Sequence, residues 1–123
     1  MRTIKFRAQD FTGSWNYGFI AKGNESAIIN PLRNDGAVIM GINIYVKPAT
    51  IGQHIGLKDI NGKEVYEGDI VRLHRNEKYS YIVEWREGCA EFVGRCVETE
   101  LGLANLNVNS EIEVIGNIHD KAE

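Results

Sequence analysis

The side chains that could do chemistry in this chain are three histidines, two cysteines and seventeen carboxylates. His54, His74 and His119 lie far apart in the sequence, and none has a neighbour at a metal-ligand spacing. We interpret all three as solvated or turn residues rather than as metal ligands or proton carriers. Any catalytic pair drawn from the seventeen Asp and Glu residues would be arbitrary, because no spacing singles one out. The sequence therefore predicts no metal site and no catalytic acid–base pair.

The two cysteines, Cys89 and Cys96, do not read as a redox or zinc pair. On one continuous strand they would be roughly 23 Å apart, whereas a disulfide needs Cα atoms within about 7 Å. A disulfide would require the chain to double back between them. Their spacing also lacks the CxxC pattern of metal and thiol–disulfide sites. We predict that both thiols are reduced and that Cys96 is the more buried one.

Sequence motifs of enzymes are also missing from this chain. It contains no Gly-rich phosphate loop, no nucleophile elbow and no HExxH motif. Glu67 and Asp69 flank Gly68 at a turn, where their expected role is to accept nearby backbone N–H groups. We therefore expect no enzyme activity, no catalytic residues and no cofactor.

One segment, from Arg72 to Tyr81, combines cations with aromatic rings. Such a combination can stack on unpaired bases, but a polar loop between strands collects the same residue types. Tyr81 also belongs to a set of residues that we expect to face inward. The candidate binding surface is therefore Arg72, Arg75, Lys78 and Tyr79, with a solvated loop as the favoured interpretation and nucleic-acid binding as the alternative.

The charge of the chain is unevenly distributed around a net value of −3. Residues 1–10 carry three Lys or Arg against one Asp, whereas residues 98–123 carry one Lys against six Asp or Glu. An acidic domain lacks the electrostatic footprint of a nucleic-acid binder, although a local basic patch is compatible with that sum. A protein partner is therefore favoured over a nucleic acid.

The composition is that of a globular, turn-rich β protein. The 123 residues make about one domain, 43% of them are hydrophobic, and thirteen glycines stand against two prolines. No apolar run approaches the ~20 residues of a membrane helix, and the N-terminus lacks the apolar core of a signal peptide. We therefore expect a cytoplasmic protein without a membrane partner.

Alternating polarity predicts strands in the N-terminal part. The residues from Ile4 to Ala8 alternate apolar with polar, and Trp15, Tyr17 and Phe19 repeat the pattern after a turn. In order, we predict a strand over 3–9, a turn over 10–13, a strand over 14–20, a loop over 22–36 with an apolar piece at 27–29, and a strand over 37–46 that ends before Pro48.

The C-terminal part can be divided into two faces of a small β barrel. The inward set is Val71, Leu73, Tyr81, Val83, Trp85, Phe92, Cys96, Ile112, Val114 and Ile118. Four apolar residues lie on the opposite face, namely Ile70, Ile82, Val93 and Ile115. Because an exposed face should be polar, these four predict a cover, either by the N-terminal strands or by a second subunit.

Turns and a short helix complete the predicted C-terminal part. Asn61-Gly62 fits the two positive-φ positions of a type I′ turn. Residues 86–89 predict the hairpin turn between two barrel strands, and residues 98–104 predict one or two turns of helix.

Four segments form a recognisable set, namely Ile4-Lys5-Phe6-Arg7-Ala8, the turn-rich stretch over residues 52–71, Val83-Glu84-Trp85 and residues 112–118. Together these segments resemble the YopX family of phage and prophage proteins. The resemblance implies an SH3-type barrel in the C-terminal part and a phage origin, and it implies no known activity.

We therefore predict an all-β protein in which an N-terminal β segment, residues 1–48, packs on an SH3-type barrel of residues 50–120. The predicted function is that of a non-catalytic phage or prophage accessory protein that binds another protein. The alternative is a nucleic-acid-associated module that uses the 72–81 loop.

Overall fold

We describe the structure from a computed structural model of the chain. It describes residues 5–22, 27–31, 43–74, 76–88, 90–99, 102–106 and 111–120.

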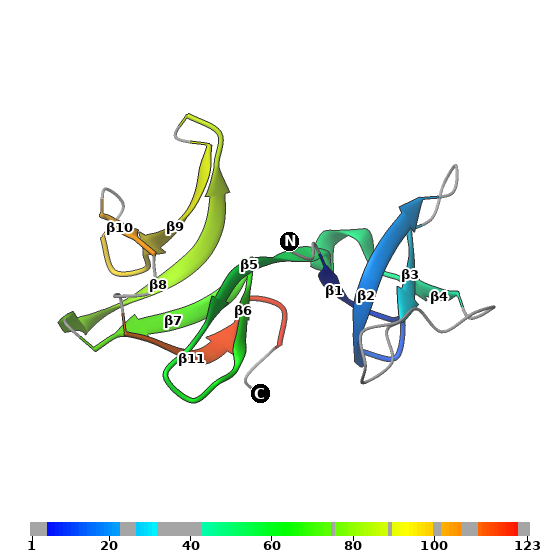
Figure 1. The fold of residues 1–123 in the computed structure, drawn as a ribbon, viewed down its shortest axis with the longest axis horizontal. Helices are drawn as coiled ribbons and strands as arrows, with labels where there is room; N and C mark the ends of the chain where they lie inside the picture. Colours follow the sequence, from blue (N-terminus) through cyan, green and yellow to red (C-terminus); the bar gives the residue numbers. More distant parts are fainter. Residues whose placement is uncertain are drawn as a thin grey trace. The chain divides into compact units, whose positions relative to one another are not determined.

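The described residues form strands in antiparallel pairs, together with one 3-10 turn (Figure 1). The all-β prediction is confirmed. The elements are β1 (Phe6–Gln9), β2 (Trp15–Lys22), β3 (Ala27–Pro31), β4 (Ile44–Val46), η1 (Pro48–Thr50), β5 (Gly52–Lys58), β6 (Glu64–Tyr66), β7 (Asp69–Leu73), β8 (Asn76–Arg86), β9 (Glu91–Cys96), β10 (Leu103–Asn105) and β11 (Ile112–Asn117).

The strands make two sheets, and the chain divides into two compact units. One sheet has the order β4-β3-β2-β1-β5-β6 and the other has the order β10-β9-β8-β7-β11. Unit 1 is residues 1–54 and unit 2 is residues 55–123, so that β5 begins in the first and ends in the second. The strand pairs of the described residues do not close either sheet. The SH3-type barrel, its 50–120 limits and the packing of the 1–48 segment on it stay predictions.

Unit 1 is held together on one face of its sheet. Ala8, Ala27, Ile29 and Val46 form its buried core, and each follows from the alternation of its strand. The turn η1 adds a tie, because the Thr50 hydroxyl accepts the backbone N–H of β1's last residue at 2.9 Å. Residues 27–31, placed in a loop from the sequence, form the strand β3 instead, because their apolar side chains complete this core.

Unit 2 buries most of the predicted inward set. Six of its ten members are buried and two more pack against them, but Trp85 and Ile118 are exposed. The buried members are Val71, Leu73, Tyr81, Val83, Cys96 and Ile112, and the partly buried ones are Phe92 and Val114. Cys96 is buried and free, whereas Cys89 lies outside the described residues, so that the comparison between the two cysteines stays a prediction.

The prediction that Trp85 lies in the core is wrong. Its indole is 44% exposed. The pairing of β7 with β8 ends at Ile82, and the pairing of β10 with β9 covers only residues 93–95 of β9. Trp85 therefore lies near the turn of the β8–β9 hairpin, where β8 and β9 pair only with each other. The alternation predicted that Trp85 shares a face with Val83, but it could not predict where the neighbouring strands end.

Val93, predicted to face outward, is 3% exposed. It lies in β9 between Glu84 of β8 and Asn105 of β10, so neighbouring strands flank it on both sides. On the same face Arg95 donates to Glu84 across 2.6 Å. The other outward residues are half-buried, as Ile70 and Ile82 are, or exposed, as Ile115 is.

The turn that contains Asn61-Gly62 is not of type I′. Gly62 has a φ of 82°, but Asn61 does not have a positive φ. The Gly62 N–H donates to the Asp59 carbonyl at 3.0 Å, and the Asp59 N–H donates to Lys63 at 2.7 Å. This is a three-residue loop with glycine in the left-handed position that closes it. The Asp59 side chain selects it by accepting the N–H groups of Asn61 and Lys63.

The turn around Gly68 is confirmed, with a φ of 89° at this glycine. Asp69 accepts the Tyr66 N–H at 2.8 Å, as expected of a turn carboxylate. The Gly68 N–H donates to the Val83 carbonyl at 2.8 Å, and the Gly68 carbonyl accepts the Ile118 N–H at 2.9 Å. The turn therefore joins β7 to the neighbouring segments of unit 2.

Two further turn and helix predictions have different outcomes. A hairpin turn joins β8 to β9 as predicted, but it is shifted by one residue from the predicted 86–89, because Arg86 still belongs to β8 and the Ala90 N–H donates to the Glu87 carbonyl. The helix predicted over 98–104 is wrong, because residues 103–105 form β10 and pair with β9. In the described part of the chain, no helix has the length and apolar character needed to cross a membrane.

Candidate functional site

The predicted binding surface is only partly described. Arg72 lies on β7, is exposed, and has Ser80 and Glu113 as cross-strand partners. Tyr79 is half-buried and packs against the core of unit 2. Arg75 and the side chain of Lys78 lie outside the described residues. The surface made of these four residues stays a prediction.

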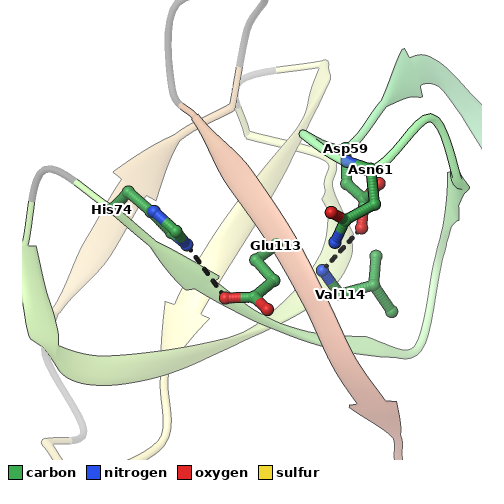
Figure 2. A network of polar contacts seen from close by, with 5 residues as sticks. All are labelled: Asp59, Asn61, His74, Glu113 and Val114. Carbon is green, nitrogen blue, oxygen red and sulfur yellow. Dashed lines mark hydrogen bonds and ion pairs between the residues drawn. The ribbon is translucent and has the colours of Figure 1, made fainter.

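Close to this segment, a histidine meets a carboxylate. Nε2 of His74 lies 2.9 Å from Oε1 of Glu113 on the neighbouring strand β11 (Figure 2). Both side chains are about one-third exposed. Solvent screening makes such a pair a weak contributor to stability, so we interpret it as a surface contact between β11 and the end of β7.

Asp59 is a carboxylate of unit 2 that accepts several backbone N–H groups. Oδ2 accepts the Val114 N–H at 3.1 Å, which ties the 59–63 turn to β11 (Figure 2). Oδ1 accepts the N–H groups of Asn61 and Lys63 at 2.9 and 2.8 Å. Burial on its own raises the pKa of Asp59, but these three donors and the Lys63 charge outweigh it, so the pKa lies below its ordinary value.

A second carboxylate, Glu98, follows β9 and accepts hydrogen bonds from Ser80 of β8. It accepts the Ser80 backbone N–H and hydroxyl, both at 3.0 Å. These bonds hold the pKa of Glu98 below its ordinary value. The buried Cys96 thiol donates to the same carboxylate at 3.7 Å. Next to it, burial raises the pKa of Tyr81, and the nearby Cys96, Tyr79 and Glu98 charges add to that effect.

The carboxylate of unit 1 with a shifted pKa behaves in the same way. Asp10 accepts the Thr12 hydroxyl at 2.6 Å and the N–H groups of Thr12 and Ser14 at 2.9 and 3.1 Å. These bonds, with one from Asn16, lower the pKa of Asp10 to about 2. Among the described residues, no group of three or more His, Cys, Asp or Glu could hold a metal ion.

Trp85 forms an exposed aromatic pair in unit 2. Its ring meets that of Phe92 edge-on, with centroids 5.0 Å apart and planes at 69°. Phe92 faces it across the β8–β9 pair and packs against the core on its other side. One ring of the pair is therefore anchored and the other is presented to solvent, which is the arrangement of a contact residue in a binding surface.

Unit 1 presents a larger aromatic set on the side of its sheet that is opposite to the core. We call Trp15, Tyr17, Phe19 and Tyr45 the aromatic face. The first three alternate along β2. Ile28 of β3 pairs with Ala21 of β2 on one side and with Tyr45 of β4 on the other, so that Tyr45 lies on the same face. Exposure is 45% for Tyr17, 36% for Phe19 and 57% for Tyr45.

A cation belongs to this face. Arg7 of β1 is opposite Tyr17, is 4% exposed, and places its guanidinium 4.5 Å from the centre of the Trp15 ring. A cation stacked on an aromatic ring is attracted by the ring's π electrons. Arg7 and Trp15 thus form a stacked pair under the more exposed rings.

The sequence alone does not indicate a site here. The alternation of Trp15, Tyr17 and Phe19 predicts a hairpin strand. The signal in the sequence was that all three alternating residues are aromatic, whereas the exposed side of a strand is usually polar. Placing Tyr45 beside them required the strand order β4-β3-β2-β1.

Comparison with known sequences assigns a family. No curated protein matches this chain. The sequence model of the family described as YopX protein matches residues 5–123, which include both sheets. The chain therefore belongs to the YopX protein family.

Proposed function

We propose that this protein is a non-catalytic accessory protein, encoded by a phage or prophage, that acts in the cytoplasm by binding another protein. Three carboxylates support the non-catalytic part by their surroundings. Asp10, Asp59 and Glu98 have a lowered pKa because each accepts hydrogen bonds from nearby backbone N–H groups or side-chain donors. A general acid or base at neutral pH needs a pKa moved toward 7 instead.

The exposed pair of Trp85 and Phe92 supports a protein partner. Trp is enriched among the residues that contribute most to protein interfaces, where a ring anchored on one side is buried by the partner. Unit 2 carries eight Lys or Arg against fourteen Asp or Glu, a net charge of −6. This charge favours a basic protein surface as the partner of unit 2 and opposes a polyanion.

The alternative is a nucleic acid bound along residues 72–81, and it has less support. Arg72 is exposed, but Tyr79 packs against the core and offers less of its ring for stacking. The acidic balance of unit 2 also repels phosphate groups.

Affinity capture from infected cells tests the proposed function. The tagged full chain should retain a protein after nuclease treatment, and Trp85→Ala should release that protein. Val97→Ala is the matched control, since Val97 is also exposed in unit 2 but is not part of the aromatic pair. Loss of the captured protein after nuclease treatment, or equal capture by Trp85→Ala, would contradict the proposal.

A further inference from the structure

We propose that the aromatic face of unit 1 binds single-stranded nucleic acid by stacking unpaired bases on Tyr17, Phe19 and Tyr45. This function goes beyond the protein partner proposed for unit 2 and uses a different surface. It rests on the geometry of the face, its charge and its polar groups.

The geometry provides stacking surfaces on a rigid support. Tyr17 and Phe19 are two residues apart on β2, which places them roughly 7 Å apart along one face. β2 is in the middle of its sheet and pairs with both β1 and β3, so the backbone under these rings is fixed on both sides. Sheet faces that bind single-stranded RNA use two or three exposed aromatic rings in this way.

The charge of unit 1 complements a phosphate backbone. Residues 1–54 contain six Lys or Arg against three Asp or Glu, a net charge of +3, although the whole chain has −3. Lys5 precedes β1 by one residue and shares the parity of Arg7, so it belongs to the same face. Asp10 has the opposite parity to Arg7 and bonds to Asn16, which places this carboxylate away from the aromatic face.

Polar groups lie beside the exposed rings. Asn30 of β3 is directly opposite Phe19, and its Nδ2 donates to Oδ1 of Asn43 at 2.6 Å. Amide groups next to a stacked base can form hydrogen bonds with its edge. This face is mixed in character, because Asn30 lies among the rings together with the apolar Ala21 and Ile28.

Unpaired bases are the required ligand, because a duplex keeps its bases stacked on one another. The full chain should therefore bind a short labelled single strand of thymidylate, measured by fluorescence anisotropy, and should bind a duplex of equal length much more weakly. Affinity should fall as the salt concentration rises, since binding releases the counterions of the phosphates.

Three variants at Phe19 separate stacking from apolar contact. Phe19→Ala should weaken binding by about 5- to 100-fold, which is the usual effect of removing one stacked ring. Phe19→Leu, which keeps most of the apolar area but has no π face, should weaken it comparably. Phe19→Trp should restore it.

Phe11 supplies the matched control. It is an aromatic residue of unit 1 that is 70% exposed, and it lies in the β1–β2 turn rather than on one of the strands that carry the aromatic face. Phe11→Ala should leave the affinity unchanged. Circular dichroism melting of every variant checks that the sheet is intact. Tyr45→Ala, on the edge strand β4, removes a second ring of the aromatic face and should also weaken binding.

The outcomes are decisive in both directions. Binding that is lost in Phe19→Ala and Phe19→Leu but kept in Phe11→Ala supports the proposal. Absence of binding at low salt, equal binding of duplex, or equal losses in Phe11→Ala and Phe19→Ala would overturn it. Because Trp85→Ala leaves unit 1 unchanged, it should bind the oligonucleotide normally, so this proposal and the proposed protein partner can fail separately.

Discussion

Asp59 allows the sharpest test of how unit 2 is held together. β11 is an edge strand of the five-stranded sheet, and the 59–63 turn attaches to its free side. The Ile60 N–H donates to the Ile112 carbonyl at 2.8 Å, and Oδ2 of Asp59 accepts the Val114 N–H. One carboxylate oxygen thus shapes the turn, and the other binds the turn to β11.

Two substitutions separate these functions. Asp59→Asn keeps an oxygen for the N–H groups of Asn61 and Lys63, but places an NH₂ group against the Val114 N–H. Asp59→Ala removes all three bonds. A hydrogen bond to a charged group contributes about 1.5–3 kcal/mol, and water replaces part of that at the exposed turn. We therefore expect losses of about 2 kcal/mol for Asp59→Asn and about 3 kcal/mol for Asp59→Ala.

Amide hydrogen exchange and thermal melting measure the two effects. In Asp59→Asn, protection of the Val114 amide should fall while that of Lys63 is retained. Each lost kcal/mol should lower the melting temperature by about 4–8 °C in a domain of this size. Unchanged Val114 protection in both variants would refute the proposed link between the turn and β11.

The pH dependence follows from the lowered pKa of Asp59. Its stabilising contribution is complete above the ordinary value of 3.8 and is lost as the pH falls through the lower pKa of the folded state. The stability difference between the wild type and Asp59→Ala should therefore be constant near neutral pH. It should shrink only below pH 3.8, which acid titration of both proteins can check.

Five further substitutions test the fold. Gly18→Ala should unfold unit 1, since its Cβ would clash with the Asn30 carbonyl oxygen of β3. Gly88→Ala should melt like the wild type, because no atom of the described residues lies within 4 Å of the added Cβ. Gly62→Ala should cost about 1–2 kcal/mol in urea denaturation because of the φ of 82°. Trp85→Ala should remain folded and soluble, with a loss of unfolding free energy well below the ~3–5 kcal/mol of a buried Trp. Val83→Ala, at a buried position, should lose about 2 kcal/mol of unfolding free energy. Insoluble Trp85→Ala would contradict its exposed placement.

Local pattern determined the strands of this protein. Alternation from Trp15 to Phe19 and from Tyr81 to Val83 predicts strands, because side chains in a strand point to opposite faces in turn. The apolar side of Tyr81 and Val83 is buried, whereas the aromatic side of the Trp15–Phe19 strand faces away from the core of unit 1. Gly62 and Gly68 likewise mark the two turns, since glycine takes a positive φ without steric cost. The family could also be assigned from the sequence, because the segments that carry the resemblance occur along most of the chain.

The extent of each sheet was decided by the tertiary structure. Trp85 and Val83 have the same parity, yet one is exposed and the other is buried, because the flanking strand β7 ends its pairing before Trp85. Residues 103–105 became a strand because β9 offered a free edge, although their spacing suited a helix. Local spacing carries no information on where a neighbouring strand stops.

The candidate sites depend on the same distinction. The sequence showed a basic N-terminal end and an acidic C-terminal end, and the division into units gives this contrast its boundary, between a basic unit 1 and an acidic unit 2. Tyr45 joins Phe19 on one face because β3 lies between their strands, a relation between residues 26 positions apart in the sequence. Parity along a strand is local and can be read from a sequence, whereas the order of strands is set by packing of the whole sheet.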